Sequence, residues 1–233
     1  MNIDLSYYSG IGKRKNNEDA VSVLENTNGL LAIVADGLGG MENGEIASKQ
    51  AVKVMNDTLG TGRVSAEAME AGIIKANKEI YLLQRYYPGA HSTIAAVWLE
   101  ENFAFAMHVG DTRIYQFRDD NVIYQSVDHS MAQMAALSGE LKQEEIRTHK
   151  ERNRLFRALG DSEAPKVAEK LLEIREGDRL LICSDGFWEK ILETEMIATA
   201  KQTKNAEDWL RLMRARAEPA ANDNNTAVAI VIH

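Results

Sequence analysis

Two aspartates of the chain stand in the same local pattern, in which an apolar run is followed by Asp-Gly. Asp36 follows "LLAIVA" (30–35), and Asp185 follows "LLICS" (180–184). A carboxylate at the end of a buried strand is costly unless another group compensates its charge. A single Asp-Gly is usually only a turn, so it is the whole set of acids that indicates chemistry. The other members, in turns or just before expected strands, are Glu18, Asp19, Asp111 and Asp223.

These carboxylates can gather in one place only if a positive charge neutralises them, because like charges a few ångströms apart otherwise force protonation. Arg14 and Arg113 lie in the same segments, but a divalent cation would neutralise the group better. A site of oxygen ligands suits Mg²⁺ or Mn²⁺, and the His and Cys spacing of a zinc site is absent from the sequence. The glycine after each aspartate would let the backbone turn sharply and bring its own carbonyl to the ion.

Composition narrows the class of protein. The 233 residues are 45% hydrophobic and carry a formal net charge of −8, which suits one domain (1–233) and argues against nucleic acid as a partner. We expect no membrane contact, because no apolar run approaches the roughly 20 residues that span a bilayer. The N-terminus lacks a secretory signal and the lone Cys183 lies in an apolar run, so we expect a cytoplasmic protein with Cys183 in its core.

The order of the expected strands and helices, which must position these acids, favours an α+β fold. The block 92–126 has the spacing of an antiparallel meander, and Met69, Ile73 and Ile80 form an apolar helical stripe. Helices covering antiparallel sheets fit this order better than the regular alternation of a Rossmann fold. Strands are expected at 3–9, 20–25, 30–35, 92–99, 103–109, 112–117, 121–126, 167–174, 178–184 and 225–233. Helices are expected at 42–59, 65–86 and 205–217, with shorter ones at 130–138, 142–148 and 151–158.

Seven ordered blocks resemble the metal-dependent serine/threonine protein phosphatases of the PPM (type 2C) family, especially its compact bacterial members. They cover almost the whole chain, which makes the resemblance far more specific than one Asp-Gly. The blocks are "GKRKNNEDA" (12–20), "VADGLGGMENGEIAS" (34–48), "VGDTRIY" (109–115), "DHS" (128–130), "NRLFRALG" (153–160), "LLICSDGFWE" (180–189) and "DNNTAVAIV" (223–231).

The resemblance implies a four-layer α-β-β-α sandwich, with two mainly antiparallel sheets flanked by helices, and two Mn²⁺ or Mg²⁺ ions at one end. Asp36 would bridge both ions and the Gly37 carbonyl would bind one, while Asp185 and Asp223 would complete the other. Glu18 and Asp19 would act through water, and Asp111 with Asp185 would bind a third, weaker ion. Arg14 would hold the substrate phosphate, Asn224 would orient the site, and residues 130–163 would form a variable flap.

Chemistry and family agree on a mechanism. Two cations can share a bridging water and lower its pKa, giving a hydroxide that attacks phosphorus directly. Two histidines common in relatives are replaced here by Leu38 and Met41, so the general acid is unassigned, and metal-bound water is the preferred candidate. His91, where relatives usually have glycine, is expected in a surface or packing role.

We therefore expect a monomeric phosphatase of phosphoserine and phosphothreonine that acts on phosphorylated proteins and opposes a bacterial Ser/Thr kinase. One alternative is a catalytically silent phosphoprotein-binding module, which the intact acids and Arg14 argue against. Another is a different two-metal hydrolase, such as a small-molecule phosphatase or a nuclease. The acidic charge weighs against a nuclease, and the ordered blocks weigh against both.

Overall fold

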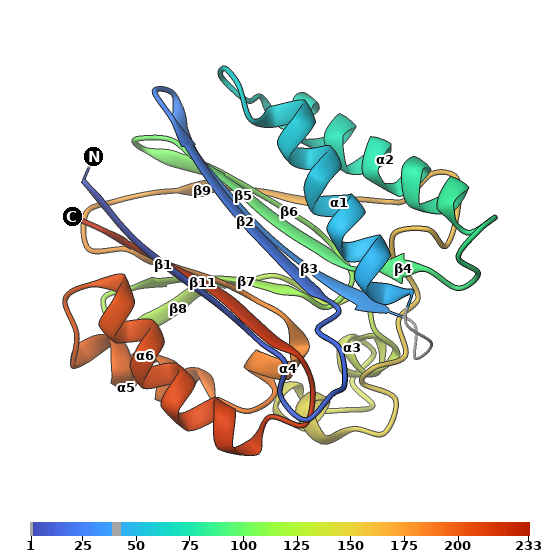
Figure 1. Cartoon of the computed structure of the whole chain (residues 1–233). Helices are drawn as coiled ribbons and strands as arrows, with labels where there is room; N and C mark the ends of the chain where they lie inside the picture. The colour runs from blue at the N-terminus through green and yellow to red at the C-terminus, as the bar shows by residue number, and fades with distance from the viewer. Residues whose placement is uncertain (1, 39–42) are drawn as a thin grey trace.

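Two β-sheets lie face to face, and helices cover the outer face of each (Figure 1). The computed structural model describes residues 2–38 and 43–233. This is the expected four-layer sandwich, and its strand pairs are antiparallel throughout the described ranges. None of the described helices is both long enough and apolar enough to cross a membrane.

The first sheet carries helices α1 (Gly44–Leu59) and α2 (Ala66–Leu83) on its outer face (Figure 1). Helix α2 begins after Ser65, whose side chain accepts a hydrogen bond from the backbone N–H of Ala68, as an N-cap should. The strands of this sheet, in spatial order, are β2 (Asp19–Asn26), β3 (Gly29–Leu38), β5 (Ile94–Leu99), β6 (Phe103–Val109) and β9 (Ala168–Glu173), with the short β4 (His91–Ser92) paired to the end of β3.

The second sheet carries α5 (Glu193–Lys201) and α6 (Ala206–Ala217) on its outer face. Three short elements lie at the end of the sandwich opposite the two chain termini: α3 (Met131–Leu137), α4 (Asp185–Trp188) and the 3₁₀ turn η1 (Gln143–Thr148). A second 3₁₀ turn, η2 (Glu218–Ala220), follows α6. The strands of this sheet, in spatial order, are β1 (Ile3–Gly10), β11 (Asn225–Ile232), β10 (Arg179–Cys183), β7 (Arg113–Arg118) and β8 (Asn121–Gln125).

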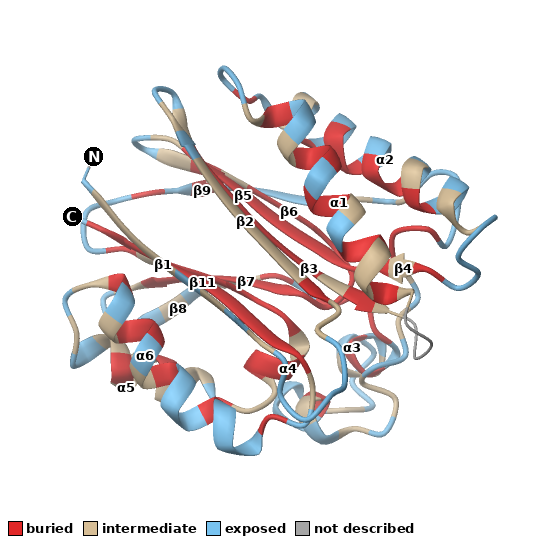
Figure 2. Ribbon diagram, viewed as in Figure 1, coloured by how far each residue is buried: buried red, intermediate tan, exposed pale blue. Residues whose placement is uncertain are grey.

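Burial on both faces explains why the central strands read as continuous apolar runs. Successive side chains of a strand point to opposite faces, so Leu31 and Ile33 of β3 pack under α1 and α2. Leu30 and Val34 of the same strand face the second sheet. A third cluster lies between the second sheet and α4, α5 and α6. Figure 2 shows the central strands of both sheets coloured as buried, whereas edge strands such as β1 and β2 are only partly buried. Cys183 is buried in the third cluster, as expected.

The strands between 92 and 126 do not form the single meander that their spacing predicted. Strand β5 pairs with β6, and β7 pairs with β8, but β6 and β7 belong to different sheets. The chain crosses from one sheet to the other at residues 110–112. Short polar connections indicate neighbouring strands, but they do not say which sheet each strand joins. This crossing puts Asp111 at the common end of both sheets.

Other local predictions also needed correction. No helix forms at 151–158, because residues there are drawn out into bridges that pair Leu155 with Ser130 and Leu159 with Ser92. The expected strand 92–99 is interrupted at Thr93, between β4 and β5. The sequence reading missed α4 and α5, and the segment 142–148 is a 3₁₀ turn over 143–148.

Candidate active site

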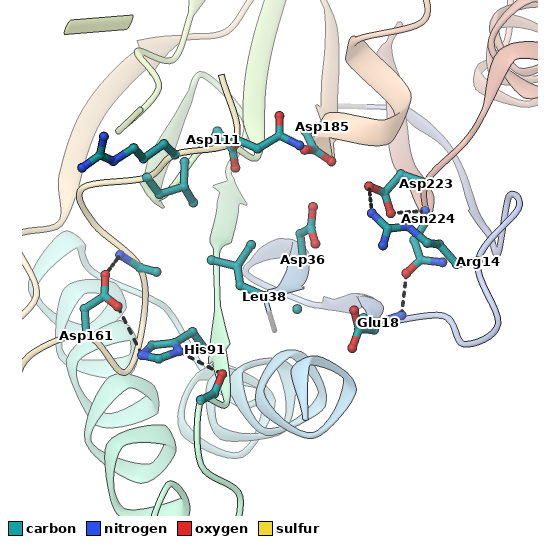
Figure 3. A pocket seen from close by; sticks show the side chains of 16 residues that line it. Arg14, Glu18, Asp36, Leu38, His91, Asp111, Asp161, Asp185, Asp223 and Asn224 are labelled. Atoms are coloured by element: carbon teal, nitrogen blue, oxygen red, sulfur yellow. Dashed lines mark hydrogen bonds and ion pairs between the residues drawn. The ribbon is translucent and has the colours of Figure 1, made fainter. Parts of the chain in front are cut away.

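An open cavity of about 530 Å³ lies at the end of the sandwich where the two sheets meet. Most of the predicted site residues line it, although they come from segments far apart in the sequence. Figure 3 shows Asp36 in the middle, Asp111 and Asp185 on one side, and Asp223 with Arg14 on another. The predicted residues that line the cavity are Arg14, Glu18, Asp36, Gly37, Asp111, Asp185, Asp223 and Asn224. Asp19 is buried behind them and does not line the cavity.

Asp36 and Asp19 are placed by strand pairing. They are direct partners across β2 and β3, so two acidic side chains stand opposite each other, an arrangement that is unfavourable without a compensating charge. One carboxylate oxygen of Asp19 accepts a hydrogen bond from the Ser184 hydroxyl at 2.8 Å. Its other oxygen, Oδ1, is buried without a hydrogen-bond partner among the described residues. Asp19 and Asp185 both lie close enough to Asp36 for their charges to act on its carboxyl group.

A hydrogen bond connects the two segments that carry Asp111 and Asp185. Asp111 stands in the sheet crossing, and Asp185 is the first residue of α4. Trp188, at the end of that helix, donates from its indole Nε1 to the backbone oxygen of Asp111 at 2.9 Å. The Trp188 side chain is buried. Thr93 and Thr112 close the crossing through a hydroxyl–hydroxyl bond of 2.5 Å.

Asn224 holds the loop that carries Arg14. Its side-chain amide donates to the backbone oxygens of Ile11 and Asn16, both at 2.9 Å, and its carbonyl oxygen accepts from the backbone N–H of Glu18 at 2.8 Å. Both amide hydrogens and the carbonyl oxygen of the Asn224 side chain are thus bonded to the 11–18 loop. Arg14 itself, with its side chain 53% exposed, donates to Asp223 at 2.5 Å.

Three glycines let backbones touch around the cavity. A Cβ at Gly37 would lie 2.3 Å from the carbonyl group of Gly44, and a Cβ at Gly186 would lie 2.0 Å from the carbonyl oxygen of Asn224. Gly12, which also needs its positive φ of 58°, packs against the carbonyl of Asp223. Two reasons were predicted for Gly37, a sharp turn and the approach of its carbonyl to an ion, and the second stays a prediction. The observed reason is different, because Gly37 lies within strand β3 and makes a close backbone contact with the start of α1.

Burial and mutual repulsion make the acids hard to ionise. Burial raises the pKa of Asp36 well above its usual range, and Asp19 and Asp185 raise it further. Burial likewise raises the pKa of Asp111, with Asp185 adding to the effect. The pKa of Asp185 is raised to about 7, chiefly by burial and then by Glu189 and Asp223. Burial raises the pKa of Asp19 to about 6, and it raises that of Glu18 as well.

The two arginines of these segments form their salt bridges with Asp223 and Asp128, and not with Asp36 or Asp185. The Arg14 guanidinium lies against Asp223, and that hydrogen bond raises the pKa of Arg14. Arg113, the other arginine of these segments, points away and makes two hydrogen bonds to Asp128 at 2.8 and 2.7 Å. Asp36, Asp185 and Asp111 are therefore an acidic cluster without a matching positive side chain among the residues described.

This donor set fits hard divalent cations. Every candidate ligand is an oxygen. Among the described residues, no positive side chain pairs with Asp36, Asp185 or Asp111, and Asp19 Oδ1 has no hydrogen-bond partner. In the described ranges no three or more Asp, Glu, His or Cys side chains surround one point closely enough to hold an ion by themselves. Each ion would therefore rely on one or two carboxylates, on a backbone carbonyl such as that of Gly37, and on water, as Mg²⁺ usually does.

His91 is the direct β-pair partner of Leu38. Both residues line the cavity, but the His91 ring points toward Asp161, whose Oδ1 lies 3.2 Å from its Nε2 (Figure 3). Its Nδ1 lies 3.0 Å from the Gly89 oxygen, so both ring nitrogens are engaged. This agrees with the packing role expected for His91. Met41 lies outside the described residues.

The sequence reading did not single out one wall of the cavity. It consists of Asn153, Arg154, Leu155, Ala158 and Asp161, all from the 130–163 segment. The block "NRLFRALG" contains most of these residues, so the resemblance marked the region without giving its members a role.

Comparison with known proteins agrees with this geometry. The family described as protein phosphatase 2C matches residues 8–229. The serine/threonine phosphatase stp of Listeria monocytogenes is 30% identical over 228 residues, covering 94% of this chain and 90% of that protein. The solved serine/threonine phosphatase of S. agalactiae superposes with a TM-score of 0.91 at 27% identity, covering all of both chains. The catalytic domain of the phosphatase PstP, solved with two manganese ions, gives 0.81 at 28% identity and 99% coverage of each chain.

Proposed function

Because the chain belongs to the protein phosphatase 2C family, we propose that its acidic cavity hydrolyses phosphoserine and phosphothreonine in proteins with the help of bound divalent cations. The observation that carries this proposal is the cluster of Asp36, Asp185 and Asp111, which lines the cavity and has no salt-bridge partner among the described residues. The PstP domain that contains two manganese ions supports the choice of cation.

Each acidic residue would have its own part in binding the cations. Asp36, which lies between Asp19 and Asp185, would contact both ions, and the Gly37 carbonyl would contact one of them. Asp185 and Asp223 would serve the second ion, with Glu18 and Asp19 acting through water. Asp111 would share a third, weaker ion with Asp185. When bound, such a pair of cations supplies an activated water as nucleophile and neutralises the charge of the transferring phosphoryl group.

Arg14 is the residue that would bind the substrate phosphate. Its guanidinium is a planar, permanently charged fork that matches two phosphate oxygens. In the structure this fork contacts Asp223 and is half exposed at the mouth of the cavity. When substrate binds, Arg14 would therefore turn at least part of this fork from the Asp223 carboxylate to the phosphate. The hydrogen bonds of Asn224 to the 11–18 loop keep Arg14 within reach of both partners.

The substrates that we propose are phosphorylated proteins, and the enzyme opposed is a Ser/Thr kinase. The names of the relatives, serine/threonine phosphatases, support the residue type. The open cavity, walled on one side by the 130–163 segment, suits a side chain presented on a protein surface. We further propose that the protein acts as a monomer in the cytoplasm and that residues 130–163 form a flap within a single domain.

The proposal is tested by Mn²⁺-dependent turnover of p-nitrophenyl phosphate and of a phosphothreonine peptide. Asp36→Ala and Asp185→Ala should each lose at least about 10³-fold in kcat/KM, since cation chemistry supplies several kcal/mol to the transition state. Circular dichroism should show both variants folded. A wild-type protein without metal-dependent turnover would indicate a silent binding module. Turnover of the small phosphate ester alone would indicate a small-molecule phosphatase.

A further inference from the structure

A largely buried ring of side chains lies beneath the segments that carry Asp111 and Asp185, which we call the metal loops. Trp188 is at the centre of this ring. The Arg113 guanidinium stacks on the Trp188 ring at 3.4 Å from the ring centre, and the Arg147 guanidinium lies at 5.4 Å. Cation–π contacts of this kind are strongest where water is excluded. Trp188 is only 2% exposed, and Arg113 has a side-chain exposure of 3%.

The ring closes through two further side chains. Arg113 Nη1 donates to the Tyr115 hydroxyl at 3.0 Å, and this hydroxyl donates to Glu193 at 3.1 Å. Arg147 Nη2 donates to the same Glu193 oxygen at 2.5 Å. Glu193 thus connects both guanidinium groups that contact Trp188, and together the two arginines fix the orientation of the indole.

The position of Arg147 carries an energetic cost, because one of its donors is not paired among the described residues. Its side chain is 10% exposed, and its Nη1 is buried without a hydrogen-bond partner among the described residues. A buried, unsatisfied donor on a charged group is unfavourable. Arg147 belongs to η1, in the 130–163 segment that walls the cavity, and Arg152 of the same segment pairs with Glu189 beside Trp188. The 130–163 segment is therefore bonded through Arg147 and Arg152 to the region around Trp188, and it also forms one wall of the cavity.

Trp188 connects the 130–163 segment to Asp111 and Asp185. Its Nε1 holds the Asp111 backbone oxygen, and its helix begins with Asp185. We propose that Arg147 is a positioning residue, which fixes the spacing of the Asp111 and Asp185 loops through Trp188 although it touches neither cation nor substrate. The inference rests on the proposed function, because it assumes that these two acids bind the cations.

Mn²⁺ binding, measured by titration calorimetry without substrate, tests the inference. Arg147→Met keeps the length of the side chain but removes the charge and the donors. We expect its Kd for Mn²⁺ to rise about tenfold, as happens when groups that orient metal ligands are removed. Arg147→Lys, which keeps a cation for Glu193, should recover part of the loss. The Mn²⁺ concentration for half-maximal turnover should rise by the same factor, with kcat at saturating Mn²⁺ nearly restored.

Lys150→Met is the matched control, because it removes a cation from an exposed position of the same segment and should leave Mn²⁺ binding unchanged. Trp188→Phe keeps a ring between the arginines but removes the bond to Asp111, and it should weaken Mn²⁺ binding even if Arg147→Met does not fold. Unchanged Mn²⁺ affinity in folded Arg147→Met or in Trp188→Phe overturns the inference, as does an equal loss in Lys150→Met. Failure of the wild-type protein to bind Mn²⁺ would instead refute the proposed function.

Discussion

The Arg113–Asp128 pair is a buried ion pair near the site, and replacing Arg113 with Met should destabilise the protein severely. Both side chains are almost inaccessible, at 3% and 2% exposure, and two parallel hydrogen bonds of 2.8 and 2.7 Å join them. Arg113→Met would leave the Asp128 carboxylate buried without these donors. Breaking a buried pair from one side costs about 3–5 kcal/mol, which agrees with two lost bonds to a charged group at about 1.5–3 kcal/mol each.

Urea unfolding followed by tryptophan fluorescence would measure this loss. A cost of about 3–5 kcal/mol corresponds to a midpoint lowered by about 1–2 M, given the slope usual for a chain of this size. Adding Asp128→Asn to Arg113→Met should recover part of the stability, because it removes the stranded charge. Arg211→Met serves as control, since the exposed Arg211–Asp208 pair should contribute less than about 1 kcal/mol. A loss below about 1 kcal/mol in Arg113→Met would show that the pair does not behave as buried.

Two further predictions concern the cavity. The folded protein without metal raises the pKa of Asp19 to about 6 and that of Asp185 to about 7, above the value of about 3.9 in an unfolded chain. The stability that this shift contributes is present below about pH 4 and is lost as the pH rises to about 7. Urea unfolding of the metal-free protein should therefore show lower stability at about pH 8 than at about pH 5. Asp36→Asn or added Mn²⁺ should reduce the difference, and a stability that rises over this range would contradict the reasoning. Gly186→Ala should cost about 1–3 kcal/mol and lower Mn²⁺-dependent turnover, because its Cβ would meet the Asn224 oxygen at 2.0 Å; a variant with wild-type unfolding and turnover would show that the contact is not needed.

The candidate acids could be found from the sequence because each follows a local rule. Asp36 and Asp185 follow apolar runs that only a buried strand explains, and the ordered blocks of the family fixed the rest. Their convergence in one cavity agrees with that reading. Asp19 differs, because strand pairing places it opposite Asp36 and behind the cavity wall. Pairing register is a property of two strands together, and one strand alone does not reveal it.

The features that escaped the sequence reading all depend on distant partners. The crossing at Asp111 depends on β7 pairing with β10, which lies about 65 residues further along the chain. The segment 151–158 has helix-forming residues, but its bridges to Ser92 and Ser130 draw it out instead. The missed helix α5 buries little besides Met196 and Thr199, so its apolar periodicity is weak. The ring around Trp188 joins residues from four separate segments, and no local pattern marks it.

The backbone contacts at the three glycines have a practical consequence. The walls that face the acids are held together by main chain against main chain, at Gly37 with Gly44, Gly186 with Asn224, and Gly12 with Asp223. The carboxylates project from this framework, and the backbone contacts that form it do not involve their side chains. A protein stripped of its reactive acids should therefore still offer an intact recess with Arg14 at the mouth, and could serve as bait to capture phosphorylated partners that the active enzyme would release.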